Sequence, residues 1–142
     1  MISSVVIIGG SFASILSAHA ILRDIPTAKV TLINASGKFF FNIAAPRILA
    51  KPTAIKPEDY LIEIAPLFGR YSPESFTFVE GKATSIDHAK RSVTIQDGRT
   101  VSYDYLIIAS GSTTASTLEE TSGLAPWKAS PDGKTADLIR VS

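Results

Sequence analysis

Two apolar segments of the chain each end in a run of small residues, and this repeated arrangement restricts the folds that the chain can adopt. Residues 5–8 precede Gly9-Gly10-Ser11, and residues 106–108 precede Ala109-Ser110-Gly111. A short buried strand that ends in a glycine-rich turn is typical of the parallel sheets of α/β nucleotide-binding domains. Together the two segments indicate a dinucleotide ligand.

The first glycine turn is followed by a predicted helix and then by a second strand. Apolar residues recur at helical spacing from Phe12 onward, and Pro26 ends the pattern. Residues 29–33 alternate in polarity and are rich in β-branched side chains, as in a strand. This strand–helix–strand unit has the size of a βαβ crossover, so the sequence predicts an open α/β sheet.

Downstream segments predict shorter elements and a β-meander. One helix is expected to begin at Pro46, a second to cover residues 58–68, and a last one to begin at Ala136, capped by Thr135. The strand candidates are residues 76–79, 83–86, 92–96 and 101–109. The predicted fold class is α/β, a Rossmann-like FAD/NAD(P)-binding partial domain with an attached β-meander. Residues 1–142 are expected to form a single, incomplete domain.

Composition excludes several classes of function. The net charge of +1 and the lack of a basic stripe argue against a nucleic-acid partner. The absence of cysteine and the presence of only two histidines argue against a metal site and a redox disulfide. No segment has the pattern of a signal peptide or a membrane span, so a cytoplasmic location is expected by default.

The first glycine turn is suited to binding a pyrophosphate. Gly9 and Gly10 allow a tight turn, and the helix that follows would direct free N–H groups at the phosphates. In the G-x-G-x-x-G pattern the second and third glycines fall at Ser11 and Ser14. The β-carbon of Ser11 reduces the space for the pyrophosphate, and that of Ser14 reduces the space between the helix and the strand. An ordinary strand–turn–helix without a ligand therefore stays an alternative. The order of the motifs favours FAD.

The acidic residue that usually holds the adenosine ribose would fall near Asn34. An asparagine can form a hydrogen bond with a ribose hydroxyl but carries no charge, so a weaker grip on the ribose is expected. Asn34 is equally compatible with a plain turn residue.

The chain resembles the AMID-like (apoptosis-inducing-factor-2-like) flavoproteins, within the pyridine-nucleotide-disulfide reductase fold. The resemblance covers nearly the whole chain, and the order and spacing of several blocks carry it. These blocks are Gly9-Gly10-Ser11-Phe12-Ala13, Asn42-Ile43-Ala44-Ala45-Pro46-Arg47, Gly81-Lys82-Ala83, and Tyr103-Asp104-Tyr105-Leu106-Ile107-Ile108-Ala109-Ser110-Gly111-Ser112. Members of this family bind FAD and are NAD(P)H-dependent oxidoreductases, and many of them reduce quinones.

The resemblance assigns cofactor-binding positions to this chain. Arg47 matches an arginine that approaches the flavin or its phosphates, and Lys51, four residues on, would assist it. Ala83 matches the position where the backbone meets the adenine. The implied cofactor-binding residues are Gly9, Gly10, Ser11, Phe12, Ala13, Asn34, Arg47, Lys51, Ala83, Ala109, Ser110 and Gly111. Arg47 and Lys51 are also compatible with a solvated cationic face.

No residue can be assigned to catalysis. His19 is interpreted as a packed or partly buried helix residue, because no acidic partner lies near it in sequence. No pair of acid and base and no nucleophile stands out.

Three functions are compatible with the sequence. The chain is the FAD-binding portion of an NAD(P)H-dependent, quinone-reductase-like flavin oxidoreductase, with FAD affinity that is weak or lost and no NAD(P)H site of its own. Alternatively, it is a cofactor-free, homo-oligomeric isomerase, cyclase or small-molecule-binding protein that reuses the fold. As a third alternative, it is an interaction module for a full-length reductase or a partner chain.

Overall fold

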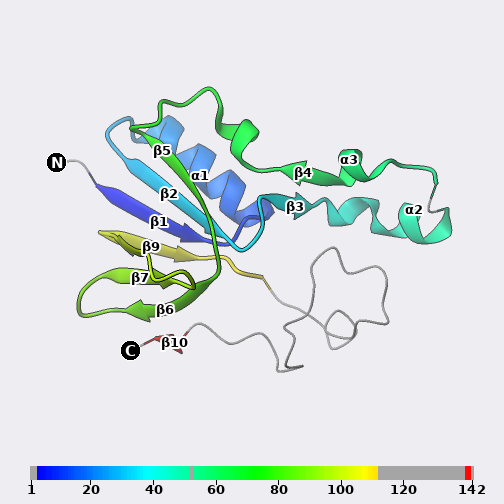
Figure 1. Ribbon diagram of the computed structural model, residues 1–142. Coiled ribbons are helices and arrows are strands. Elements are labelled where there is room, and N and C mark those ends of the chain that lie inside the picture. Colours follow the sequence, from blue (N-terminus) through cyan, green and yellow to red (C-terminus); the bar gives the residue numbers. More distant parts are fainter. Residues whose placement is uncertain (1–2, 52, 112–139, 142) are drawn as a thin grey trace.

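A computed structural model of the chain describes residues 3–51, 53–111 and 140–141. Its centre is a four-stranded sheet with the strand order β5-β2-β1-β9 (Figure 1). These strands are β1 (Ser4–Ile8), β2 (Lys29–Asn34), β5 (Phe76–Glu80) and β9 (Tyr105–Ile108). All neighbouring pairs are parallel, so the carboxyl ends of the strands meet at one edge of the sheet.

Helix α1 (Phe12–Asp24) covers one face of this sheet, together with the short helix η2 (Ala65–Phe68). Residues alternate between the two faces of a strand, so β1 directs Val5 and Ile7 toward α1. The buried core on this side consists of Val5, Ile7, Ile15, Ala18, Leu22, Val30, Leu32, Phe39, Ile64 and Phe68.

A second sheet covers the opposite face, with the strand order β10-β6-β7-β8. Its strands are β6 (Ala83–Asp87), β7 (Ser92–Ile95), β8 (Thr100–Ser102) and β10 (Arg140–Val141). Val6 and Ile8 of β1 face this sheet and complete a second core. The central strand β1 is therefore buried on both faces, as its continuous apolar run predicts.

An arm between β2 and η2 extends away from the central sheet (Figure 1). Its base is an antiparallel pair of β3 (Lys38–Phe40) and β4 (Leu61–Glu63). The outer part of the arm contains η1 (Asn42–Ala44), α2 (Ala45–Ala50) and α3 (Pro57–Tyr60).

The predicted fold class is confirmed: a parallel sheet with helices and an attached meander forms a partial Rossmann-like domain. The strand–helix–strand unit formed by β1, α1 and β2 is correct in type and nearly in bounds. The helix predicted at Pro46 is α2, and β5, β6 and β7 are found where strands were expected.

The single helix predicted over residues 58–68 is wrong. This segment is divided into α3, the strand β4 and the 3-10 helix η2. Two causes act together. Pro66 lacks an N–H group and cannot continue a helix that began upstream, so a new 3-10 helix starts there with the proline in its first turn. Residues Leu61–Glu63 pair instead with β3, and hydrogen bonds from the Phe41 N–H to the Tyr60 carbonyl (2.7 Å) and from the Ile64 N–H to the Gly37 carbonyl (2.9 Å) extend this pairing on both sides.

The strand predicted over residues 101–109 is divided into β8 and β9. The chain crosses from one sheet to the other at Tyr103-Asp104. The Tyr103 N–H donates to the Arg91 carbonyl (2.9 Å), whereas the Asp104 N–H donates to the Ser4 carbonyl (2.9 Å). Of the helix expected from Thr135 and Ala136, the start lies outside the described residues, and Arg140–Val141 forms a strand instead.

Candidate functional site

The turn between β1 and α1 is held tightly against neighbouring strands. Gly9 has φ of +114°, and its N–H donates to the Ile33 carbonyl (2.8 Å). A β-carbon at Gly9 would collide with the Ala109 carbonyl, and one at Gly10 would lie 2.5 Å from Asn34 Cγ. Gly9 therefore requires glycine, because its φ is positive and the backbone at the end of β9 lies against it, whereas a side chain at Gly10 would displace the side chains of Asn34 and Ile64.

The first turn of α1 is open at its N-terminus. Ser11 is the N-cap residue, with extended backbone angles, and its hydroxyl forms no capping hydrogen bond. No acidic side chain lies in the first turn, which includes Phe12 and Ala13. Backbone N–H groups at this end have no helical partner, and the helix dipole makes the end partly positive. These residues therefore fit the phosphates of a dinucleotide.

The end of β9 lies beside this turn. The Ala109 N–H donates to the Ile8 carbonyl (2.8 Å), and the fully buried Ser14 hydroxyl donates to the Ala109 carbonyl (3.4 Å). Ser14 is thus accommodated where a glycine is usual, and its hydroxyl joins α1 to the end of β9. Beyond Ser110, Gly111 has φ of +73°, and among the described residues no atom lies within 4 Å of a β-carbon placed there.

Asn34 lies at the carboxyl end of β2, next to Gly10. Its side-chain Nδ2 donates to the Ser36 carbonyl (2.8 Å), so its Oδ1 is directed elsewhere as an acceptor. Ala83 begins β6, is buried and pairs with Ile95. The backbone joins these two regions, because the Gly81 N–H donates to the Asn34 carbonyl (2.8 Å).

The side chain of Phe12 belongs to the core rather than to an open site. Its ring packs edge-on against Phe39 and Phe41, with both centroid distances 5.6 Å. These contacts attach the start of α1 to the base of the arm.

The structure does not bring Arg47 and Lys51 to the glycine turn. Arg47 is an exposed residue of α2, and Lys51 follows the end of this helix, where its N–H donates to the Arg47 carbonyl (2.9 Å). In Figure 1, α2 lies far along the arm, away from the β1–α1 turn. A ligand that contacts both places would have to extend along the arm.

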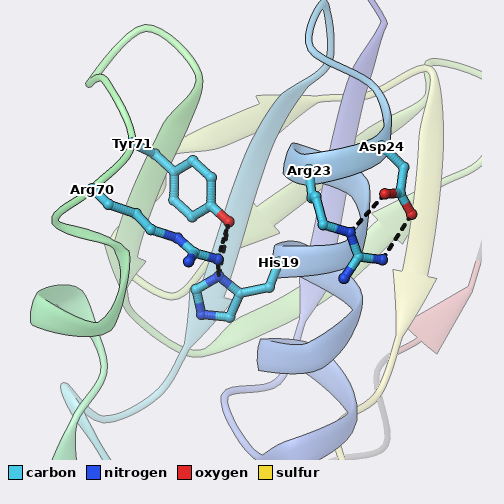
Figure 2. A network of polar contacts seen from close by, with 5 residues as sticks. All are labelled: His19, Arg23, Asp24, Arg70 and Tyr71. Carbon is cyan, nitrogen blue, oxygen red and sulfur yellow. Dashed lines mark hydrogen bonds and ion pairs between the residues drawn. The ribbon is translucent and has the colours of Figure 1, made fainter.

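A polar cluster that sequence reasoning missed forms on the outer face of α1 (Figure 2). The His19 ring stacks on Phe68, with centroids 4.3 Å apart, and its Nδ1 lies 3.1 Å from the Tyr71 hydroxyl. Arg70 donates to the same hydroxyl (2.7 Å) from above the Tyr71 ring. The prediction that His19 is a packed helix residue is confirmed. Its partners lie more than fifty residues further along the chain, so no local signal indicated them.

Burial lowers the pKa of His19, and the nearby Arg70 guanidinium lowers it further. In the neutral ring, Nδ1 accepts the Tyr71 proton, because Arg70 already donates to the Tyr71 oxygen. The cluster joins α1 to the segment that follows η2. It lies among aromatic core residues, which indicates a structural role.

Within residues 3–51, 53–111 and 140–141, no group of three or more His, Asp or Glu side chains is arranged to hold a metal ion. None of the described helices is long and apolar enough to cross a membrane.

Comparisons with known proteins agree with this geometry. Residues 3–137 match the family described as pyridine nucleotide-disulphide oxidoreductase. The chain is 42% identical over 118 residues to oxidoreductase ptaL of Pestalotiopsis fici, covering 78% of this chain and 32% of that protein. It is 37% identical over 111 residues to a sulfide-quinone reductase of Aquifex aeolicus, covering 78% of this chain and 25% of the reductase. The chain thus spans a third or less of the length of these relatives.

Solved structures show the same fold. The sulfide:quinone oxidoreductase from Aquifex aeolicus superimposes with a TM-score of 0.69 at 37% identity, covering 78% of this chain and 25% of the other. A water-forming NADH oxidase from Lactobacillus brevis superimposes with a TM-score of 0.63 at 21% identity, again covering 78% and 25%. The second likeness concerns the fold alone.

Proposed function

The chain belongs to the pyridine nucleotide-disulphide oxidoreductase family, and we propose that it is the FAD-binding portion of an AMID-like, NAD(P)H-dependent flavin oxidoreductase that reduces quinones. The family generally binds FAD. The observation that carries the proposal is the open N-terminus of α1 at the edge where the parallel strands end. Dinucleotides bind at this edge in open α/β sheets.

Each predicted residue has a role in this proposal. The first-turn N–H groups of Phe12 and Ala13 would hold the pyrophosphate, and Gly9 and Gly10 would let it approach. Asn34 would accept a hydrogen bond from the ribose, and the Ala83 backbone would meet the adenine. The backbone of Ala109, Ser110 and Gly111 would line the cofactor. Arg47 and Lys51 would face its far end, along the arm.

Bound FAD would supply the capacity to accept a hydride and pass electrons on. The residues of this chain would bind and orient the cofactor. We propose no binding site for the hydride donor NAD(P)H among them. FAD affinity is proposed to be weak, because Asn34 lacks the charge of the usual ribose-binding carboxylate and Ser11 adds a β-carbon at the turn. Turnover with NAD(P)H and a quinone would then depend on more than this chain.

The proposal is tested by titrating the purified chain with FAD and following flavin fluorescence. The informative variants are Ser11→Asp and Ser11→Asn, because both residues are good N-caps and Ser11 is exposed. Aspartate would repel the phosphates and is expected to weaken binding by about tenfold or more, whereas asparagine should change it little. Saturable binding that is insensitive to Ser11→Asp would contradict the proposed phosphate site. If the chain stays folded and excess FAD gives no change in flavin fluorescence, the flavin function is rejected.

A second candidate function, an interaction module, is favoured by the outer strand β9. Tyr105 is 63% exposed and Ile108 is 52% exposed, and β9 is at the edge of the described sheet. An edge strand with exposed apolar side chains is a surface on which another chain can pair. Light scattering across a range of concentrations tests this function. A chain that remains monomeric and does not bind a full-length relative would exclude it.

A further inference from the structure

The carboxylate of Glu80 lies at the same edge of the sheet as Asn34. Asn34 is the last residue of β2, Glu80 is the last residue of β5, and the two are direct partners in the parallel ladder. Asn34 is therefore not the only polar side chain that these neighbouring strands place at the predicted ribose position. A negative charge is available on the neighbouring strand.

Close packing determines where this carboxylate lies. A β-carbon on Gly37 would lie 2.9 Å from Glu80 Oε2 and 3.7 Å from Oε1, so the carboxylate rests against the loop that follows Asn34. The same loop is held by the hydrogen bond from Asn34 Nδ2 to the Ser36 carbonyl. Gly37 thus leaves room for the Glu80 side chain to approach the β2–β3 loop.

The backbone around Glu80 is fixed on both sides. The Glu80 carbonyl accepts a hydrogen bond from Arg99 Nη2 (3.0 Å), and the next residue, Gly81, donates its N–H to the Asn34 carbonyl (2.8 Å). Arg99 is itself anchored by Asp97 at 2.6 Å. The Glu80 side chain is exposed. A ligand can therefore reach its carboxylate in the free protein.

Asn34 by itself offers limited capacity to a ribose. Its Nδ2 already donates to Ser36, so Oδ1 is the acceptor that remains for a hydroxyl. A ribose with free 2′- and 3′-hydroxyls presents two donors, which a carboxylate accommodates better than a single amide oxygen.

We propose that Glu80 supplies the carboxylate that binds the adenosine ribose, in place of an acidic residue at position 34. This inference rests on the proposed dinucleotide site and adds its specificity-determining residue. Asn34 and Glu80 together accept the ribose hydroxyls, and the negative charge of Glu80 excludes ligands with a 2′-phosphate. The proposal assigns the selectivity to β5 rather than to β2.

The test compares ADP with 2′-deoxy-ADP, titrated calorimetrically into the 142-residue chain. The unchanged chain is expected to bind ADP about tenfold more tightly, because the deoxy ligand lacks one hydroxyl. Glu80→Gln is expected to bring this preference down to about twofold. The double variant Asn34→Asp with Glu80→Gln should restore it, since a carboxylate is then present on β2. The matched control is Glu74→Gln, which removes an exposed carboxylate from the segment before β5.

The outcomes separate the two proposals. If the unchanged chain binds ADP and FAD but Glu80→Gln retains the full preference, the role of Glu80 is rejected and the dinucleotide site stands. If the unchanged chain binds neither ligand, both are rejected. Equal thermal unfolding of Glu80→Gln and Glu74→Gln would show that a lost preference arises from the ligand contact, and rescue by the double variant shows the same by a second route.

Discussion

Ser4 and Asp104 are 100 residues apart and bind each other in both directions. The Ser4 N–H and hydroxyl donate to Asp104 Oδ2, at 2.8 and 2.9 Å. The Asp104 N–H donates to the Ser4 hydroxyl (3.0 Å) and to the Ser4 carbonyl (2.9 Å). This pair aligns the starts of β1 and β9, and so sets the register at which Ile8 meets Ile108 and the glycine turn meets Ala109.

Asp104→Asn should reduce the pH dependence of stability in acid. The hydrogen bond from the Ser4 N–H, and then that from its hydroxyl, lower the pKa of Asp104 below 3.8. A lowered carboxyl pKa stabilises the fold above 3.8, and this contribution is lost as the pH falls through the lowered pKa. Urea unfolding of both chains, from neutral pH to below 3.8, should give curves that converge in acid. Curves that remain parallel would show that the Ser4 contacts do not favour the ionised carboxylate.

His19→Gln should weaken the loss of folding stability that the unchanged chain shows as the pH falls below 6.5. The lowered pKa of His19 means that the unfolded chain binds a proton before the folded chain does. Stability from this group is therefore complete above 6.5 and is lost as the pH falls from 6.5 through the lowered pKa. Protonation would also oppose Arg70, which lies 3.4 Å from His19 Nδ1. Denaturant unfolding should show a decline below 6.5 for the unchanged chain that is weaker in His19→Gln.

His88→Gln is the control for this experiment, because His88 is an exposed residue of the turn between β6 and β7. It should leave the decline in place. If His88→Gln removes the decline and His19→Gln does not, the cluster on α1 is not its source.

Gly9→Ala and Gly111→Ala should differ in severity although both glycines have positive φ. At Gly9 the strained backbone and the collision with the Ala109 carbonyl act together, so a loss of about 3 kcal/mol or more is expected. At Gly111 none of the described residues would meet the added β-carbon, so its substitution should cost about 1 kcal/mol from backbone strain alone. Chemical unfolding measures both. Similar losses would mean that the close approach of the β9 end does not constrain the turn.

Arg47→Ala should affect FAD and ADP differently. Arg47 lies on α2 of the arm, away from the glycine turn (Figure 1), so in the proposed binding mode it would contact the flavin end of FAD, which ADP lacks. FAD affinity should fall about tenfold, with ADP affinity unchanged. Lys56→Ala removes an exposed cation from the same arm and is the control. An equal loss for both ligands would place Arg47 at the pyrophosphate instead.

The sequence predicted the elements whose local pattern and final environment agree. The apolar run of β1 and the helical spacing of α1 are read directly, because both are set by the core that they enter. The prediction of one helix over residues 58–68 was wrong because the apolar spacing there also suits a strand paired with β3. Such pairing depends on tertiary structure and cannot be read from local sequence.

The candidate site divides in the same way. The glycine turn and the open end of α1 were visible in the sequence, since backbone geometry determines them. The cluster of His19 with Arg70 and Tyr71, and the contact of Glu80 with the β2–β3 loop, depend on side chains brought together by the fold. Polar residues of this kind carry no periodic signal.

The position of β1 in the sheet has a consequence for synthesis on the ribosome. Among the described strands β1 is made first, yet it occupies the centre of the sheet, and one of its two neighbours, β9, is made after nearly all the others. At about 5 to 20 residues per second, one side of β1 would wait roughly 5 to 20 s for its partner. Until Tyr105–Ile108 is made, the apolar strand β1 exposes an unpaired edge. Such an edge can pair with strands of other nascent chains that are translated from the same messenger RNA, so the nascent chain needs protection from them.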